Sequence, residues 1–262
     1  MDVCNLRCGA GLGSHMQHAG KAPCLGLEKP RAPGVASSRH LDAFWKLVKV
    51  RDRIERGETI IGPMHRSKHL TLLAEGVACM STRHEDGARQ IYAFYYPGDF
   101  LALQGFLMPS STEPLEVQAL TNCFVGTIDR NLLEQALQHH PSLGQSLWGA
   151  AMIEASVHRQ RLIIMRRPAL QRVAHLLCEQ LARLGSDQRL IPLSQIEIAD
   201  AAGLSVVHTN RVFQDLRKLG ILSKDRLTEV VDKQRLHELA AFDGHYLDAG
   251  EALSGWDVRI EG

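Results

Sequence analysis

"PLSQIEIADAAGLSVVHTNRVFQDLRKLGIL", residues 192–222, has the pattern of two short helices joined by a tight turn. Ser194 and Glu197 have the spacing of a capping box, which begins a helix. Gly203 marks the end of that helix, because glycine tolerates the positive φ that such a turn requires. Ser205 is the expected N-cap of the second helix. The spacing therefore predicts a helix-turn-helix.

The second helix of this motif has two kinds of surface. Thr209, Val212 and Leu216 recur at helical spacing and are expected to face inward. The other face is polar apart from two valines, which suits the major groove of DNA. There an arginine can bind guanine, an asparagine can bind adenine, and a valine can contact a thymine methyl group. The predicted DNA-binding residues are Ser205, Val206, Val207, His208, Asn210, Arg211 and Gln214.

The residues after the motif predict a wing. "GILSKDRLTEVVD" (220–232) has the pattern of two short strands around Lys224, Asp225 and Arg226, and Asp232 is the expected cap of a further helix. The whole chain has a net charge of only +1, but nine cationic and five anionic side chains lie between residues 166 and 224. Positive charge is thus concentrated on the motif, as contact with phosphates requires.

A long helix is predicted upstream of the motif. "SLGQSLWGAAMIEASVHRQRLIIMR" (142–166) has no internal proline, Pro168 ends it, and residues 169–185 form a second amphipathic helix with Cys178 beside its apolar face. Spacings of three and four residues on the long helix predict a coiled-coil seam between two copies of the chain. The alternative is that this long helix packs against the barrel of its own chain. The predicted seam residues are Trp148, Ala151, Ala155, His158, Leu162 and Met165.

Residues 40–130 have the pattern of short strands separated by turns. Glu75-Gly76, Asp86-Gly87 and Pro97-Gly98 are turn signals between apolar runs, and this regular spacing predicts a small barrel or roll. Residues 1–38 lack apolar periodicity and are expected to form a flexible tail.

Composition excludes several classes of protein. The 262 residues include no apolar run of the roughly 20 residues that a membrane span needs, and no secretory signal, which predicts a cytoplasmic protein without membrane contact. Nucleophile elbows, phosphate loops and paired catalytic carboxylates are absent, so we expect no enzyme. His65, His69 and Glu75 fall on a loop and a strand, which scatters them, and we expect no metal site there.

The order of these parts resembles the Crp/Fnr family of bacterial transcription regulators. The resemblance covers about residues 45–240 and is carried by "DGARQIY", "PGDF" and "IADAAGLSVVHTNRVFQDLRKLGIL". It implies an α+β homodimer that binds a palindromic double-stranded DNA operator, with RNA polymerase as a further partner. The implied parts are a cyclic-nucleotide-binding-like β-roll (double-stranded β-helix) at 39–135, a dimerisation helix region at 136–167, a winged helix DNA-binding domain at 168–245 and a C-terminal tail at 246–262.

Two departures from the family pattern bear on recognition. Members that bind cyclic AMP carry Gly-Glu followed by an arginine that holds the phosphate, whereas no arginine follows Gly98-Asp99 here through Gln118. We therefore expect no cyclic AMP. Family members often have Arg-Glu where this chain has Val206-Val207, so we expect an altered half-site.

The cysteines raise the question of an iron–sulfur cluster. The Fnr branch binds a [4Fe–4S] cluster, and the resemblance offers Cys4, Cys8, Cys24 and Cys123 as its ligands. The spacing differs from the family's, and Gly126 falls where the cysteine of the roll is expected. We expect no cofactor. Two alternatives remain: a redox or oxygen sensor of the Fnr type that uses such a cluster or a reactive thiol, and a regulatory module that does not bind DNA.

Overall fold

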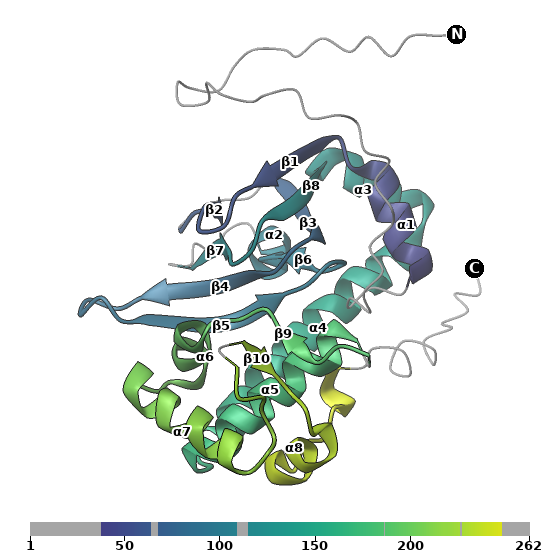
Figure 1. Ribbon diagram of the computed structural model, residues 1–262. Helices are drawn as coiled ribbons and strands as arrows, with labels where there is room; N and C mark the ends of the chain where they lie inside the picture. Colours follow the sequence, from purple (N-terminus) through teal and green to yellow (C-terminus); the bar gives the residue numbers. More distant parts are fainter. Residues whose placement is uncertain (1–37, 64–67, 109–114, 186, 226, 248–262) are drawn as a thin grey trace, which may run out of the picture.

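Two four-stranded antiparallel sheets form the N-terminal part of the molecule (Figure 1). The computed structural model describes residues 38–63, 68–108, 115–185, 187–225 and 227–247. One sheet has the strand order β1-β8-β3-β6 and the other β2-β7-β4-β5, which confirms the predicted β-roll. The strands are β1 (Val50–Ile54), β2 (Thr59–Ile61), β3 (His69–Glu75), β4 (Ala78–Arg83), β5 (Arg89–Tyr95), β6 (Phe100–Leu101), β7 (Glu116–Ala119) and β8 (Cys123–Asp129).

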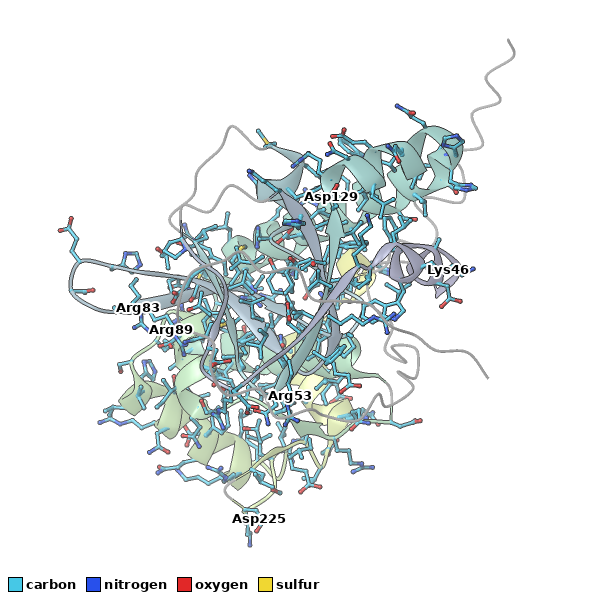
Figure 2. All side chains as sticks on the ribbon, turned by 90° about the horizontal axis from the view of Figure 1, so that it is seen from above. Lys46, Arg53, Arg83, Arg89, Asp129 and Asp225 are labelled. Carbon is cyan, nitrogen blue, oxygen red and sulfur yellow. The ribbon has the colours of Figure 1, made fainter. Side chains whose placement is uncertain are left out.

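The hairpin of β4 and β5 turns where the sequence predicted. Gly87 has φ +84°, and the side chain of Asp86 accepts a hydrogen bond from the backbone N–H of Ala88 at 2.9 Å. Figure 2 shows Arg83 and Arg89 at this hairpin, which projects beyond the rest of the roll. The hairpin therefore carries cationic side chains away from the core of the roll.

The roll contains two helices that the sequence analysis missed. α1 (Ser38–Leu47) buries Leu41 and Phe44 against the outer face of the first sheet, and the rings of Phe44 and Phe100 lie 4.9 Å apart. α2 (Leu103–Leu107) has only five residues and buries Leu103 and Phe106. α2 is too short to show a clear sequence period, and the burial of both helices depends on contacts with distant parts of the chain.

The long helix lies where it was predicted. α3 (Arg130–His139) begins at Asp129, whose side chain accepts hydrogen bonds from two backbone N–H groups, and α4 (Pro141–Ile164) follows directly. α4 buries Leu143, Leu147 and Ala150 against the roll. None of the helices in the described part of the chain is long and apolar enough to cross a membrane.

The remaining elements form a helical C-terminal part with a small two-stranded sheet (Figure 1). The wing was predicted to have two short strands after the motif, but it has one. The strand Thr228–Glu229 pairs with the strand Leu190–Ile191, which precedes the motif, and Leu222 forms only an isolated bridge with Val230. The boundary predicted between 245 and 246 falls inside the last short helix. The elements are α5 (Ala169–Leu184), β9 (Leu190–Ile191), α6 (Gln195–Ala202), α7 (Val206–Lys218), β10 (Thr228–Glu229), α8 (Lys233–Ala240) and the 3-10 helix η1 (His245–Leu247).

One hydrophobic core joins the roll to the C-terminal part. Ile91 and Phe94 of β5 belong to the same buried cluster as Leu177 of α5 and Phe213 of α7. Cys178 lies in this cluster, as predicted, and burial raises the pKa of its thiol to about 12. The two parts therefore bury apolar surface against each other as well as within themselves.

Candidate nucleic-acid interface

The first helix of the motif is held by the predicted capping box. The backbone N–H of Glu197 donates to Oγ of Ser194 at 3.3 Å, and Oε2 of Glu197 accepts from the backbone N–H of Ser194 at 2.5 Å. The helix ends at Gly203, which has φ +62°, the left-handed conformation that the turn requires. The turn is therefore set by local residues.

The second helix, α7, begins at the predicted cap. Oγ of Ser205 accepts a hydrogen bond from the backbone N–H of His208 at 3.2 Å. Thr209, Val212 and Leu216 are buried, as expected from their spacing, and Phe213 is buried with them. This packing fixes which face of α7 points outward.

The outward face of α7 carries the residues predicted to contact DNA. Val207 has 65% of its surface exposed and Val206 46%, although both are apolar. An exposed valine pair beside Asn210 and Arg211 suits base edges, where thymine methyl groups and hydrogen-bonding atoms alternate. All seven predicted residues are exposed: Ser205, Val206, Val207, His208, Asn210, Arg211 and Gln214.

One residue that holds the wing in place was not predicted from the sequence. The guanidinium of Arg217 donates to the backbone carbonyls of Ser223 and Asp225, at 3.2 Å in each case, and lies over the ring of Phe213. These contacts hold the turn that bears Lys224 beside α7. No sequence signal marked this role, because it depends on where the turn folds back.

The predicted seam lies largely on the surface of α4. Trp148, Ala155, Leu162 and Met165 are exposed, whereas Ala151 and His158 are half-buried. Met152 and Ile163 are also exposed, at 44% and 56%, and were missed. Leu162, in the last turn of α4, is 74% exposed, the most exposed of these side chains. α4 thus presents an apolar face that the described part of the chain leaves uncovered.

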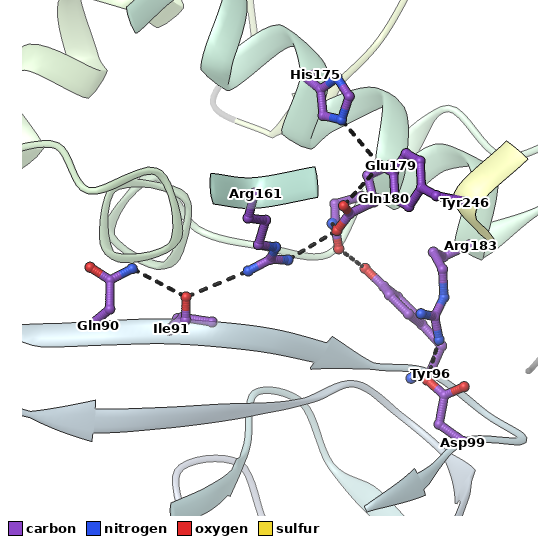
Figure 3. Close-up of polar contacts among 10 residues, drawn as sticks. All are labelled: Gln90, Ile91, Tyr96, Asp99, Arg161, His175, Glu179, Gln180, Arg183 and Tyr246. Carbon is purple, nitrogen blue, oxygen red and sulfur yellow. Dashed lines mark hydrogen bonds and ion pairs between the residues drawn. The ribbon is translucent and has the colours of Figure 1, made fainter. Parts of the chain in front are cut away.

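Buried polar contacts connect the roll, α4 and α5 (Figure 3). Arg183 of α5 is ion-paired with Asp99, and Tyr96 donates a hydrogen bond to Gln180. Glu179 accepts from Arg161 of α4 at 3.0 Å and from Tyr246 of η1, also at 3.0 Å. Tyr246 was predicted to lie in the C-terminal tail. The acidic residue of the Gly-Asp pair is therefore directed toward α5.

Two further ion pairs tie the motif itself to the roll. Nε of Arg89 in β5 lies 2.7 Å from Oδ2 of Asp200 in α6, and the two side chains are only 15% and 18% exposed. Nη2 of Arg56 lies 3.8 Å from Oε1 of Glu197, the acidic residue of the capping box. The position of α6, and with it α7, is thus coupled to the hairpin of the roll.

A cavity lies between the roll and α4. This cavity has a volume of about 180 Å³ and is lined by residues of the stretch after Asp99, including Gln104 and Leu115, and by Glu154 and His158 of α4. No lysine or arginine is among the described residues that line it. A phosphate would find no cationic partner among these described residues.

Of the four candidate cluster ligands, the structure describes Cys123. Cys123 is buried, its S–H donates to the backbone carbonyl of Val77 at 3.3 Å, and burial raises its pKa, so the thiol rather than the thiolate is favoured. At Gly126 a Cβ atom would lie 2.8 Å from Val48, so a cysteine there would clash. Cys4, Cys8 and Cys24 lie outside the described residues.

The histidines considered as metal ligands are not brought together. His69 and Glu75 lie at opposite ends of β3, both exposed, and His65 lies outside the described residues. Across the ranges that the structure describes, no group of three histidine, cysteine, aspartate or glutamate side chains could hold a metal ion.

The fold and the motif define a winged helix-turn-helix protein with a β-roll. The sequence profile of the cyclic nucleotide-binding domain matches residues 51–140, and that of the Crp-like helix-turn-helix domain matches residues 171–239. The chain is 26% identical over 202 residues to the transcriptional activator protein FnrL of Cereibacter sphaeroides, covering 72% of this chain and 79% of that one. It is 27% identical over 173 residues to the nitrogen fixation regulation protein FixK of Bradyrhizobium diazoefficiens, covering 64% and 71%.

A solved structure shows the same architecture. FixK2 from Bradyrhizobium japonicum superposes with a TM-score of 0.66 at 28% identity, covering 75% of this chain and all of that one. The chain belongs to the Crp/Fnr family, as the sequence predicted, and it is a DNA-binding transcription regulator.

The ion pair of Asp99 and Arg183 makes a testable contribution to stability. We expect Asp99→Asn to lower the free energy of unfolding by about 3–5 kcal/mol, because it leaves a buried arginine without its counter-ion. Urea denaturation followed by circular dichroism measures the loss. Asp215→Asn, which breaks an exposed pair with Lys218, is the control and should cost less than about 1 kcal/mol. Equal losses in the two variants would contradict this assignment.

Proposed function

We propose that two copies of this chain bind a palindromic DNA operator, each through the exposed face of α7. The observation that carries the proposal is the outward surface of Val206, Val207, Asn210 and Arg211, held by a buried row on the opposite side of the helix. A helix placed in this way enters the major groove with its N-terminal residues against base edges. Lys224 lies in the turn that Arg217 holds through the carbonyls of Ser223 and Asp225, and we infer that it contacts phosphate.

The apolar face of α4 supports the homodimer. Trp148, Met152, Leu162 and Ile163 of α4, and Met165 at its C-cap, are each more than 40% exposed. Burying such side chains against the same face of a second α4 is favourable, at roughly 25 cal/mol for each Å² of apolar surface. A two-fold axis along α4 would also match the symmetry of a palindromic site.

The end of α4 connects the dimer contact to the motif. The end of the Met165 side chain lies so close to Gly203 that a Cβ added to the glycine would be 3.3 Å from its methyl carbon. The two α7 helices of a dimer must lie about 34 Å apart to enter successive major grooves. A small rotation between α4 and α5 at Pro168 would change this spacing and so switch affinity for DNA.

The proposal includes no cyclic nucleotide, no iron–sulfur cluster and no catalytic step. The absence of lysine and arginine from the described lining of the cavity supports the first point, and the burial of Cys123 supports the second. FnrL is named a transcriptional activator, which supports RNA polymerase as a further partner of this chain. A regulator of this kind acts in the cytoplasm, where the DNA lies.

Arg211 provides the most direct test of DNA contact. On duplexes selected from a random pool, we expect Arg211→Ala to weaken binding by about 5- to 150-fold, because a bidentate contact to guanine is worth about 1–3 kcal/mol. Gel shift at several salt concentrations measures the change. Arg53→Ala removes an exposed arginine from β1 and should leave affinity unchanged. A chain that binds no duplex even at low salt would instead support the regulatory module that does not bind DNA.

Leu162 tests the dimer contact separately. We expect Leu162→Asp to shift the chain from dimer to monomer in sedimentation velocity, because the substitution places a charge in an apolar contact. Val50→Asp changes a similarly exposed apolar residue on β1 and is the matched control. Dimers of unchanged stability in both variants would show that this face of α4 is not the contact.

A further inference from the structure

A groove lies between the loops of the roll and the wing. Arg56, Leu120 and Thr121 of the roll line one side of it, and the segment 190–195 with residues of the wing lines the other. Its volume of about 770 Å³ falls within the roughly 300–1,000 Å³ of sites for small organic ligands, which occur preferentially where two parts of a protein meet. A molecule in this groove would therefore contact both parts of the chain.

The groove offers an apolar surface to such a molecule. Leu120, Ile191 and Leu193 line it and are buried in the protein core. Leu190 of β9 and Leu227, which directly precedes β10, also line it, but both side chains are exposed. Covering exposed leucines removes apolar surface from water and is favourable. The groove thus suits a ligand with an apolar body.

The charge of the described lining is positive. The cations are Arg56 of the roll, and Arg217 and Lys224 of the C-terminal part. Asp225 is the one carboxylate among the lining residues that the structure describes. Arginine and lysine side chains together favour a carboxylate or a phosphate, which accepts charge-assisted hydrogen bonds from them.

Two of these cations are available to a ligand. The side chain of Arg56 is 68% exposed, and its ion pair with Glu197 has an N–O distance of 3.8 Å, longer than the roughly 2.7–2.9 Å of a strong charge-assisted hydrogen bond. Lys224 is exposed and forms no hydrogen bond or ion pair with the described residues. Arg217 instead donates to two backbone carbonyls of the wing, so it shapes the wall.

The loops that carry the two sides are held by side-chain hydrogen bonds. The backbone N–H of Arg56 donates to Oδ1 of Asn122 at 3.1 Å, and that of Val77 donates to Oγ1 of Thr121 at 2.8 Å. On the other side, Arg217 fixes the turn that bears Lys224. The walls are therefore formed before a ligand binds, which lowers the entropic cost of binding.

We propose that this groove binds an amphipathic organic anion. Its head group, a carboxylate or a phosphate, pairs with Arg56 and Lys224, and its apolar body covers Leu190 and Leu227. The bound ligand bridges the roll and the wing. The proposal does not require that α7 contact DNA, although the head group and a DNA phosphate would compete for Lys224.

Probes that share an octyl chain and differ in charge test the proposal. Calorimetric titration of the full chain, without DNA, compares octanoate and octyl phosphate with 1-octanol and octylamine. We expect both anions to bind about fivefold more tightly than 1-octanol, because partly exposed ion pairs contribute modestly to affinity, and the tighter of the two identifies the head group. Octylamine should bind more weakly than 1-octanol. Acetate, which has the head group without the apolar body, should not bind.

A double variant identifies the cations responsible. Arg56→Gln combined with Lys224→Gln changes two exposed side chains, and we expect it to reduce octanoate affinity to that of 1-octanol while leaving 1-octanol unaffected. The matched control is Arg53→Gln combined with Lys218→Gln, which removes the same charge from exposed positions outside the groove and should change nothing.

Three results would overturn the proposal. They are the absence of saturable binding by either anion, binding of 1-octanol or octylamine as tight as that of the anions, and equal octanoate affinities in the double variant and its control. Because the titrations contain no DNA, none of these results bears on the proposed contact between α7 and an operator.

Discussion

The tight turn at Gly203 is the constraint on which the DNA-binding surface depends. Its left-handed backbone brings α7 across α6 at a fixed angle, and Thr209, Val212, Phe213 and Leu216 then bury one face of α7. The opposite face can only point outward. The polar residues and the two valines on that face are therefore presented by a rigid corner, and in the proposed complex their spacing along the helix decides which bases they contact.

The corner is not independent of the roll. β5 shares a buried apolar cluster with α5 and α7, and ion pairs cross the same boundary at Arg183 with Asp99 and at Arg89 with Asp200. A change in the roll or in α4 therefore alters contacts that position α6. Such coupling needs two discrete arrangements to act as a switch, and we propose that the short connection at Pro168 supplies them.

The sequence predicted what local chemistry determines. Ser194, Gly203 and Ser205 marked the ends of the two helices, and the structure places them as caps and turn. It did not predict α1, the pairing of β10 with β9, or the partner of Asp99, because each depends on residues far away in the chain. The seam stays a prediction: a helical period locates an apolar stripe but does not say which of its members, such as Ala151, the roll covers.

The most direct measurement of the central claim is the change in selected DNA sequence when one residue of α7 is changed. Duplexes bound by the native chain and by Val207→Glu should both contain two inverted half-sites about one helical turn apart. They should differ at one symmetric pair of positions, where the new carboxylate accepts a hydrogen bond from cytosine. Identical sequences from both chains, or no enrichment by the native chain, would contradict the account.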